Sequence, residues 1–279
     1  MTVHLHARLP VLVDPHLCER RRHRGFELLE KVGEGSLCAV WKAQDCRTGA
    51  IVALKELRQG RRTDGALLKG EFRALRQIAH PHVVSALALV DDGRVDGFGP
   101  FMTMEFVQGQ SLDRYLAPLQ GRRDLLPAFV CVAQQLIHAV MAVHRAGLVH
   151  RDIKCANVRV TPAGRVVLLD LDLCAPIHGG LPSCRAPGWV GTPRNNAPEV
   201  DRGRPHTPAS DWFAVGVALW TAFSGTSPFQ GDVRTLMVQK RTGRPCEDFG
   251  EATLPAGGMP DALVGVFDGL LAPRPGARL

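Results

Sequence analysis

The stretch from residue 150 to residue 157 reads His150-Arg151-Asp152-Ile153-Lys154-Cys155-Ala156-Asn157 and indicates the fold more strongly than any other part of the chain. It follows a long amphipathic segment, Ala128 to Arg145, so we expect a tight loop after a core helix. Asp152 can orient a hydroxyl and accept its proton, Lys154 can reach a transferred phosphate, and Asn157 can ligate a divalent cation. The loop alone is weak evidence, because the rest of the chain must supply the other parts of the same chemistry.

A second acidic residue lies downstream of this loop. Short strand-like runs cover Val158 to Val160 and Val166 to Leu169, and Asp170 follows the second run. A carboxylate at that place can bind a metal ion that bridges phosphates. An ordinary end-of-strand turn is the simpler interpretation, but the spacing from Asn157 favours the metal site.

The N-terminal half contains paired glycines between two predicted strands, Phe26 to Val32 and Leu37 to Trp41. Gly33 and Gly35 lack side chains, so backbone N–H groups there could approach phosphate oxygens. Val40 follows on the second strand. Paired glycines are often only a hairpin turn, so this signal depends on its neighbours.

A lysine ends the apolar run of the next predicted strand, Ile51 to Leu57. Lys55, in Val52-Ala53-Leu54-Lys55, could contact the α- and β-phosphates of a nucleotide, whereas a lysine on an edge strand would simply reach solvent. Glu71 lies on a predicted helix, Gly65 to Ile78, and is our candidate partner for Lys55. Most helical glutamates are only surface charges, so this assignment depends on position.

The remaining patterns divide the chain into two lobes. Strands at Val83 to Val90 and Phe101 to Phe106 would complete a small antiparallel sheet, and the sequence becomes helix-rich beyond Gly109. We therefore expect an α+β protein with an N-terminal extension (1–25), a small β-rich lobe with one helix (about 26–107) and a larger α-helical lobe (about 108–279).

Composition excludes several classes of protein. The chain has 279 residues, 45% of them hydrophobic, and a net charge of +7, which does not indicate a nucleic-acid partner. Its eight cysteines form no Cys-x-x-Cys pair, so we expect free thiols and no zinc site. Met1 to Pro15 lacks the features of a secretory signal. The apolar run Trp212 to Phe223 is shorter than the roughly 20 residues of a membrane span and fits a buried core helix instead. We expect a cytoplasmic protein without a transmembrane segment; its oligomeric state does not follow from the sequence.

Taken together, these motifs resemble the eukaryotic-type (Hanks-type) serine/threonine protein kinase family, in a bacterial-like form, from about Phe26 to Leu279. Ala197-Pro198-Glu199 adds another matching motif. The resemblance implies a bilobal protein kinase-like fold and transfer of the γ-phosphate of ATP, with Mg²⁺ or alternatively Mn²⁺, to serine or threonine hydroxyls of a protein substrate.

The resemblance also implies a role for each motif residue. Met104 would gate the deeper pocket, Asp211 would hold the catalytic loop, and Arg278 would pair with Glu199. Lys154 and Thr192 are similar to the serine/threonine branch. The implied catalytic residues are Asp152, Lys154, Lys55 and Glu71, the implied nucleotide contacts are Gly33, Gly35, Val40, Ala53, Lys55, Glu105 and Val107, and the implied metal ligands are Asn157 and Asp170.

Several positions depart from the family pattern. Cys38 replaces a third loop glycine, Arg159 replaces an apolar residue under the adenine ring, and Asp172 replaces the glycine of Asp-Phe-Gly. Asn195-Asn196 replaces a tyrosine-containing pair, and a last helix that follows Arg278 in relatives is expected to be absent. Ser183 is a candidate site of regulatory phosphorylation.

Two alternatives remain open from sequence. The departures at residues 38, 159 and 172 are compatible with a pseudokinase that binds nucleotide or acts as a scaffold. A small-molecule kinase shares the fold and sometimes has Asp-x-Asp at the metal site. Gly191-Thr192-Pro193 and Ala197-Pro198-Glu199 argue against the second alternative, because small-molecule kinases lack a segment that positions a peptide.

Overall fold

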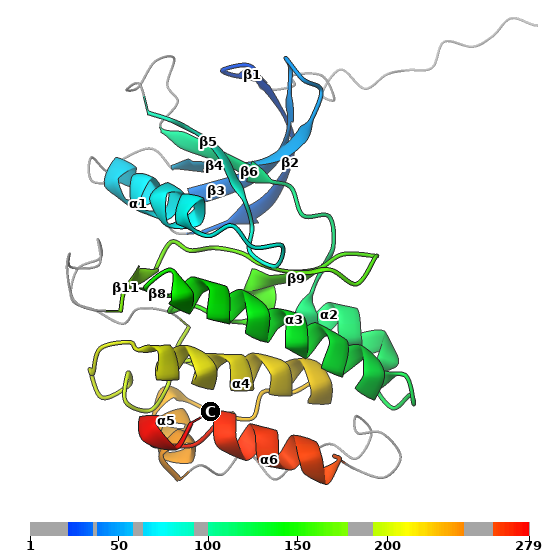
Figure 1. Ribbon diagram of the computed structural model, residues 1–279, viewed down its shortest axis with the longest axis vertical. Helices are drawn as coiled ribbons and strands as arrows, with labels where there is room; N and C mark the ends of the chain where they lie inside the picture. The colour runs from blue at the N-terminus through cyan, green and yellow to red at the C-terminus, as the bar shows by residue number, and fades with distance from the viewer. Residues whose placement is uncertain are drawn as a thin grey trace, which may run out of the picture.

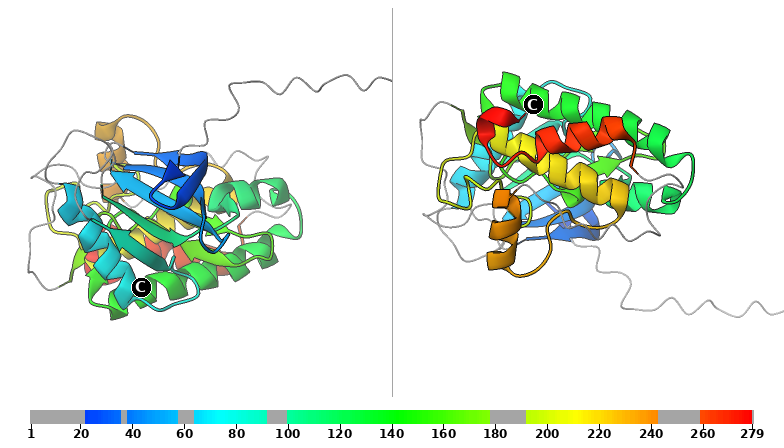
Figure 2. Two further views of the ribbon diagram at one scale, coloured as in Figure 1. Left: turned by 90° about the horizontal axis from the view of Figure 1, so that it is seen from above. Right: turned by 90° about the horizontal axis from the view of Figure 1, so that it is seen from below.

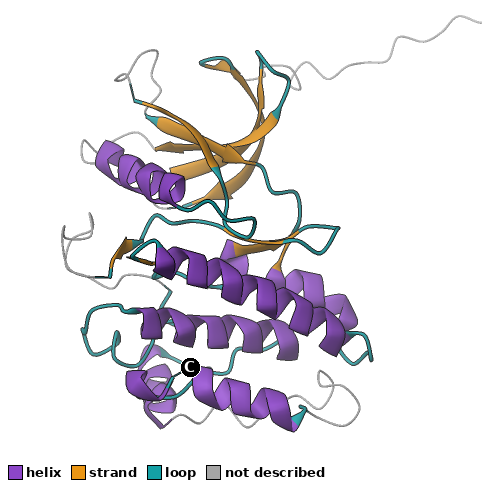
Figure 3. Cartoon of the chain, viewed as in Figure 1, coloured by secondary structure: helices purple, strands orange, loops and turns teal. Residues whose placement is uncertain are grey.

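The computed structural model describes residues 22–35, 38–57, 64–91, 100–177, 192–242 and 259–278. These residues form a small lobe with a sheet and one helix, and a larger lobe made mainly of helices (Figures 1 and 3). The predicted α+β class and the antiparallel sheet of the small lobe are confirmed.

The small lobe consists of β1 (Arg22–His23), β2 (Phe26–Glu34), β3 (Cys38–Asp45), β4 (Ile51–Leu57), α1 (Asp64–Gln77), β5 (Ala86–Val90) and β6 (Phe101–Glu105). The large lobe contains β7 (Gln110–Ser111), α2 (Leu112–Leu116), α3 (Leu125–Arg145), β8 (Leu148–Val149), β9 (Val158–Val160), β10 (Val166–Leu168), β11 (Ala175–Pro176), α4 (Pro208–Ser224), α5 (Val233–Thr242) and α6 (Asp261–Leu270). Short 3₁₀ turns cover Ala117–Leu119, Cys155–Asn157 and Pro275–Ala277.

The six-stranded sheet of the small lobe has the order β1-β2-β3-β4-β6-β5, and all its neighbouring strands are antiparallel. β4 is therefore an inner strand, and four consecutive residues of its seven, Val52 to Lys55, are buried. Helix α1 packs against β4, β5 and β6 (Figure 1). The sheet thus holds Lys55 between β3 and β6 and next to α1.

Several predicted boundaries are wrong by a few residues. β2 continues through Gly33, which pairs with Val40, so the turn between the strands begins later than predicted. β3 is described from Cys38, and the predicted start at Leu37 lies outside the described residues. β5 begins at Ala86 because Val83 instead forms a bridge with Leu168 of the large lobe. β1 pairs with β2, so the sheet begins before the predicted start at Phe26.

One apolar core runs through both lobes, from Leu75 and Met102 in the small lobe to Leu136 and Phe213 in the large lobe. Backbone hydrogen bonds cross between the lobes at the same place. The N–H of Val84 donates to the carbonyl of Leu168 at 3.0 Å, and the N–H of Leu168 donates to the carbonyl of His82 at 2.8 Å. The lobes are therefore joined by packing and by backbone contacts as well as by the connecting chain.

Helix α4 is the centre of the large lobe, between α3 and α6 (Figure 1), and α6 and α4 lie side by side in the view from below (Figure 2). Pro208 occupies the first turn, where its missing N–H costs little, and Gly225 ends the helix with a left-handed φ of 78°. A Cβ atom at Gly216 would lie 2.8 Å from Cβ of Leu270, so α6 packs closely against this glycine. Most of α4 is buried, as its apolar sequence predicts.

Among the described helices, α3 is the one long and apolar enough to cross a membrane by length and composition. Buried core helices of globular proteins can have the same length and apolar composition. Seven side chains of α3 are buried, and the helix packs against β10 and α4. This packing matches the core helix that the amphipathic pattern predicts.

Candidate active site

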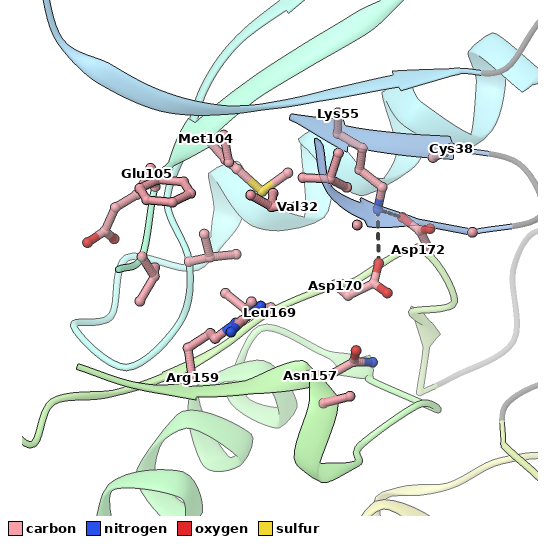
Figure 4. Close-up of a pocket in the computed structure, with 18 of the residues that line it drawn as sticks. Val32, Cys38, Lys55, Met104, Glu105, Asn157, Arg159, Leu169, Asp170 and Asp172 are labelled. Carbon is pink, nitrogen blue, oxygen red and sulfur yellow. Dashed lines mark hydrogen bonds and ion pairs between the residues drawn. The ribbon is translucent and has the colours of Figure 1, made fainter. Parts of the chain in front are cut away.

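A cavity of about 940 Å³ lies between the two lobes (Figure 4). Strands of the small lobe form its roof, the chain after β6 forms one wall, and the loop around Asp152 and the residues after β10 form its floor. All the predicted site residues contribute to its lining: Gly33, Gly35, Val40, Ala53, Lys55, Glu71, Glu105, Val107, Asp152, Lys154, Asn157 and Asp170.

Glu71 reaches the cavity because of its position on α1. Leu68 and Leu75 are buried, and Glu71 lies three residues after the first and four before the second, which places it on the same helix face. The Nζ atom of Lys55 lies 3.0 Å from each carboxylate oxygen of Glu71, and both side chains are nearly fully buried. The ion pair that the sequence predicts is therefore present.

Lys55 also contacts two acidic residues that follow β10. Its Nζ donates to Asp170 Oδ1 at 2.9 Å and to the carboxylate of Asp172 (Figure 4). Burial would lower the pKa of Lys55, but Glu71, Asp170 and Asp172 together raise it well above its usual value. Lys55 is thus a buried ammonium group surrounded by three carboxyl groups.

Asp152 is the centre of a hydrogen-bond network on the cavity floor. Its Oδ2 accepts from Nζ of Lys154 at 2.7 Å and from Nδ2 of Asn157 at 3.1 Å. Its Oδ1 accepts from the hydroxyl of Thr192 at 3.0 Å. The carboxylate is thereby held in one orientation, with a cation beside it.

A buried carboxylate on α4 holds the backbone of this loop. Asp211 accepts from the N–H of His150 at 2.8 Å and from the N–H of Arg151 at 2.9 Å. Arg151 has a φ of 73°, a left-handed conformation that is unfavourable for a residue with a side chain. Asp211 therefore stabilises a strained turn immediately before Asp152, as the resemblance implies.

The residues present fit a hard divalent cation. Asn157 donates through its amide nitrogen to the carbonyl of Asp152 at 2.8 Å, which leaves its amide oxygen for a metal ion. Asp170 adopts a φ of 64°, and its carboxylate lies at the cavity (Figure 4). Carboxylate oxygens of Glu71, Asp170 and Asp172 lie within 4.8 Å of one another. Oxygen donors of this kind suit Mg²⁺ or Mn²⁺ better than softer metals.

The chain that connects the lobes forms the wall at the other end of the cavity. Glu105 donates its backbone N–H to the carbonyl of Ser85 at 2.9 Å, and its side chain forms an ion pair with Arg165, the residue before β10. A Cβ atom at Gly109 would lie 2.4 Å from the carbonyl oxygen of Val160, so only glycine permits this close approach. These contacts connect the end of β6 to the β9–β10 hairpin.

Arg159 of β9 extends into the cavity floor, where the resemblance implies an apolar residue (Figure 4). Its Nη1 donates to the carbonyl of Gly109 at 3.1 Å. The aliphatic stem therefore lies on the floor, while the charged end has a partner at the connecting chain.

Cys38 lines the roof of the cavity, as expected from its place after the glycine pair. Burial raises the pKa of its thiol to about 12, although Lys55 opposes this effect. A thiol with that pKa stays protonated near neutral pH and is a poor nucleophile. In the described part of the chain Cys38, Cys46, Cys131, Cys155 and Cys174 are all free thiols, as predicted.

The structure also adds residues that the sequence interpretation did not name. Val32, Val84 and Leu169 contribute apolar surface to the cavity. Val32 could have been found, because it directly precedes Gly33 on a predicted strand. The contact between Asp172 and Lys55 could not, since nothing in the spacing shows which carboxylates reach the ammonium group.

A second buried ion pair holds the segment after Thr192. Nη1 and Nη2 of Arg278 lie 2.5 and 2.7 Å from the two carboxylate oxygens of Glu199, as the resemblance implies. Asn195 donates to the carbonyl of Ile153 at 3.2 Å and so attaches this segment to the catalytic loop. The candidate phosphorylation site Ser183 lies outside the described residues.

The fold has two lobes with one cavity between them. The cavity holds a lysine–glutamate pair, an aspartate beside a lysine, and oxygen atoms that suit a divalent cation. This combination defines the protein kinase-like class. The model of the family "Protein kinase domain" matches residues 26–259. The chain therefore belongs to the protein kinase domain family.

Curated bacterial proteins are similar to this chain over most of its length. A DNA damage-responsive serine/threonine-protein kinase, RqkA of Deinococcus radiodurans, is 32% identical over 254 residues, which cover 91% of this chain and 37% of that protein. The serine/threonine-protein kinase PknA of Mycobacterium tuberculosis is 31% identical over 225 residues, which cover 79% of this chain and 51% of that protein. A probable serine/threonine-protein kinase, PknB of Corynebacterium glutamicum, is 30% identical over 217 residues, which cover 74% of this chain and 32% of that protein. The chain thus spans about a third to a half of the length of these relatives.

Proposed function

We propose that this domain is a serine/threonine protein kinase that transfers the γ-phosphate of ATP to hydroxyl groups of a protein. The observation that carries this proposal is the convergence of two networks on one cavity. The Lys55–Glu71 pair lies in its roof, and Asp152 and Lys154, which both contact Thr192, lie in its floor.

Each network has a separate task. Asp152 would accept the hydrogen bond of a substrate hydroxyl and take its proton as the oxygen bonds to phosphorus, while Lys154 offsets the charge that develops there. Lys55 would donate to nucleotide phosphates from a position held by Glu71. Asn157 and Asp170 would hold Mg²⁺, or Mn²⁺ as the alternative, which offsets phosphate charge when it is bound.

The class of acceptor follows from Lys154, Thr192 and the relatives. Lys154 Nζ lies 3.3 Å from the hydroxyl of Thr192, and both residues contact Asp152, so both would lie beside a hydroxyl that Asp152 binds. The similar bacterial proteins are named serine/threonine-protein kinases. We therefore expect serine and threonine, not tyrosine, as acceptors.

The test is γ-phosphate transfer to a generic basic protein with Mg²⁺ or Mn²⁺, with mass spectrometry to identify the modified residues. Asp152→Asn should reduce the transfer rate by about 10² to 10⁴-fold while nucleotide affinity stays near that of the wild type, because Asp152 acts on the acceptor hydroxyl. Asp268→Asn on the exposed surface of α6 is the matched control and should behave as wild type. Wild-type transfer no faster than that of Asp152→Asn would contradict the proposal and favour a pseudokinase.

A further inference from the structure

Lys55 has more acceptors around it than it has hydrogen atoms to donate. Its Nζ lies 3.0 Å from both oxygens of Glu71, 2.9 Å from Asp170 Oδ1, and in contact with the carboxylate of Asp172. An ammonium group has three N–H donors. In this arrangement every donor of Lys55 already has a carboxylate partner, so a phosphate must displace one of them.

The three carboxylates differ in the free-energy cost of losing their contact with Lys55. The Glu71 side chain is 2% exposed, so its separation from Lys55 would leave a buried charge without a partner. Asp170 and Asp172 are 38% and 33% exposed and lie at the cavity. Asp170 is the metal ligand that the family resemblance implies, whereas Asp172 stands where that family has glycine, so the contact between Asp172 and Lys55 is the one that departs from the family pattern.

We propose that Asp172 is a positioning residue that holds Lys55 in the nucleotide-free domain and competes with nucleotide phosphate for its ammonium group. This inference rests on the proposed function, because it requires that nucleotide phosphate binds at Lys55. Asp172 thereby stabilises the empty site and weakens nucleotide binding. Glycine, the residue expected from the family pattern at this position, has no side chain that could do this.

Nucleotide affinity without divalent metal is the direct measurement, since it separates the effect on Lys55 from any effect on a metal ion. The dissociation constants of ATP and ADP are measured in EDTA and again in Mg²⁺. Asp172→Asn keeps the size of the side chain and removes its charge, and should lower the metal-free dissociation constant by about fivefold to tenfold. Asp172→Glu, which keeps the carboxylate, and the surface control Asp268→Asn should both bind as wild type does.

A double-mutant cycle with Lys55→Met tests whether Asp172 acts through Lys55. If it does, Asp172→Asn gains no affinity when Lys55 is replaced. A gain that persists without Lys55 would show simple repulsion between Asp172 and phosphate and would overturn the inference. An unchanged or raised metal-free dissociation constant in Asp172→Asn would overturn it as well, as would weaker binding confined to Mg²⁺, which would make Asp172 a metal ligand.

The failure of this inference can be distinguished from failure of the proposed function. If the wild type and all variants bind neither nucleotide, even with Mg²⁺, the proposed kinase function fails and the inference fails with it. If the wild type binds ATP and Asp172→Asn shows no metal-free gain, only the role of Asp172 is overturned. Thermal unfolding without nucleotide gives an independent readout, because Asp172→Asn should lower the melting temperature of the empty domain while it tightens nucleotide binding.

Discussion

Arg159 is a charged residue on the floor of the cavity. Val107 and Leu169 line the same cavity, and the guanidinium group of Arg159 donates to the carbonyl of Gly109. A flat ligand on this floor would cover part of the guanidinium group and remove it from water. Covering a charged group costs free energy unless the ligand offers a compensating contact.

We expect Arg159→Leu to bind ATP about threefold to tenfold more tightly than the wild type, because leucine presents apolar surface without a desolvation cost. Isothermal titration with ATP and Mg²⁺ checks this, with Arg274→Leu, at an exposed position far along the chain, as the control for loss of one positive charge. Equal or weaker binding by Arg159→Leu would indicate that the guanidinium group instead stacks favourably on the base.

Individual residues show what the sequence could predict and what it could not. Lys55 and Glu71 were predictable as a pair, because an apolar strand and a periodic helix each place one charge on a buried face. The partner of Arg159 and the attachment of Asp172 to Lys55 were not predictable. They depend on distances between segments far apart in the chain, and the sequence pattern contains no such distances.

At the scale of helices and strands, short apolar runs between turns were the most predictable features. β4 and β9 have the predicted bounds, because each run is uniformly apolar or alternating and ends at a clear change of residue type. Helices α2, α5 and α6 were not predicted. α2 is only five residues long, and the other two have exposed valines that obscure their apolar faces.

The packing of helices gives a matched pair of glycine substitutions. A Cβ atom at Gly216 in α4 would lie within 3 Å of Leu270, the last residue of α6, and of Leu271, which follows it. A Cβ atom at Gly70 in α1 would meet no atom within 4 Å. Gly216→Ala should destabilise the domain by about 1–3 kcal/mol through overpacking. Gly70→Ala should stabilise it by about 0.5–1 kcal/mol, because alanine favours the helix.

Urea denaturation of the two glycine variants measures both effects with the same substitution. The expected result is a shift of the unfolding midpoint in opposite directions, with similar slopes. If Gly216→Ala proved as stable as Gly70→Ala, α6 would have to move away from α4 at little cost. That outcome would contradict close packing between these two helices.

At the scale of the whole molecule, one arginine joins the end of the described chain to the segment whose Thr192 contacts Asp152. The side chain of Arg278 is fully buried, pairs with Glu199, donates to the carbonyls of Ala209 and Ala272, and lies 5.0 Å from the centre of the Phe213 ring. It therefore connects the 3₁₀ turn at Pro275–Ala277, helix α4 and the segment that contains Thr192.

Replacement of Arg278 by leucine should destabilise the domain by about 3–5 kcal/mol, because Glu199 would remain as a buried charge without its partner. The same change should slow phosphate transfer, since the segment that leads to Thr192 would lose its anchor and Thr192 helps to orient Asp152. Urea denaturation and transfer to a basic protein measure the two effects. Arg274→Leu, at an exposed position in the same part of the chain, should change neither.

A second substitution distinguishes the loss of the attraction between Arg278 and Glu199 from the cost of leaving the charge of Glu199 buried and unpaired. Adding Glu199→Gln to Arg278→Leu removes the unpaired charge, so the double variant should recover part of the lost stability. Transfer activity should recover less than stability does, because glutamine and leucine cannot restore the bidentate connection between the two segments. A double variant less stable than Arg278→Leu alone would show that Glu199 has other favourable partners, and the account of Arg278 as the group that neutralises Glu199 would then be wrong.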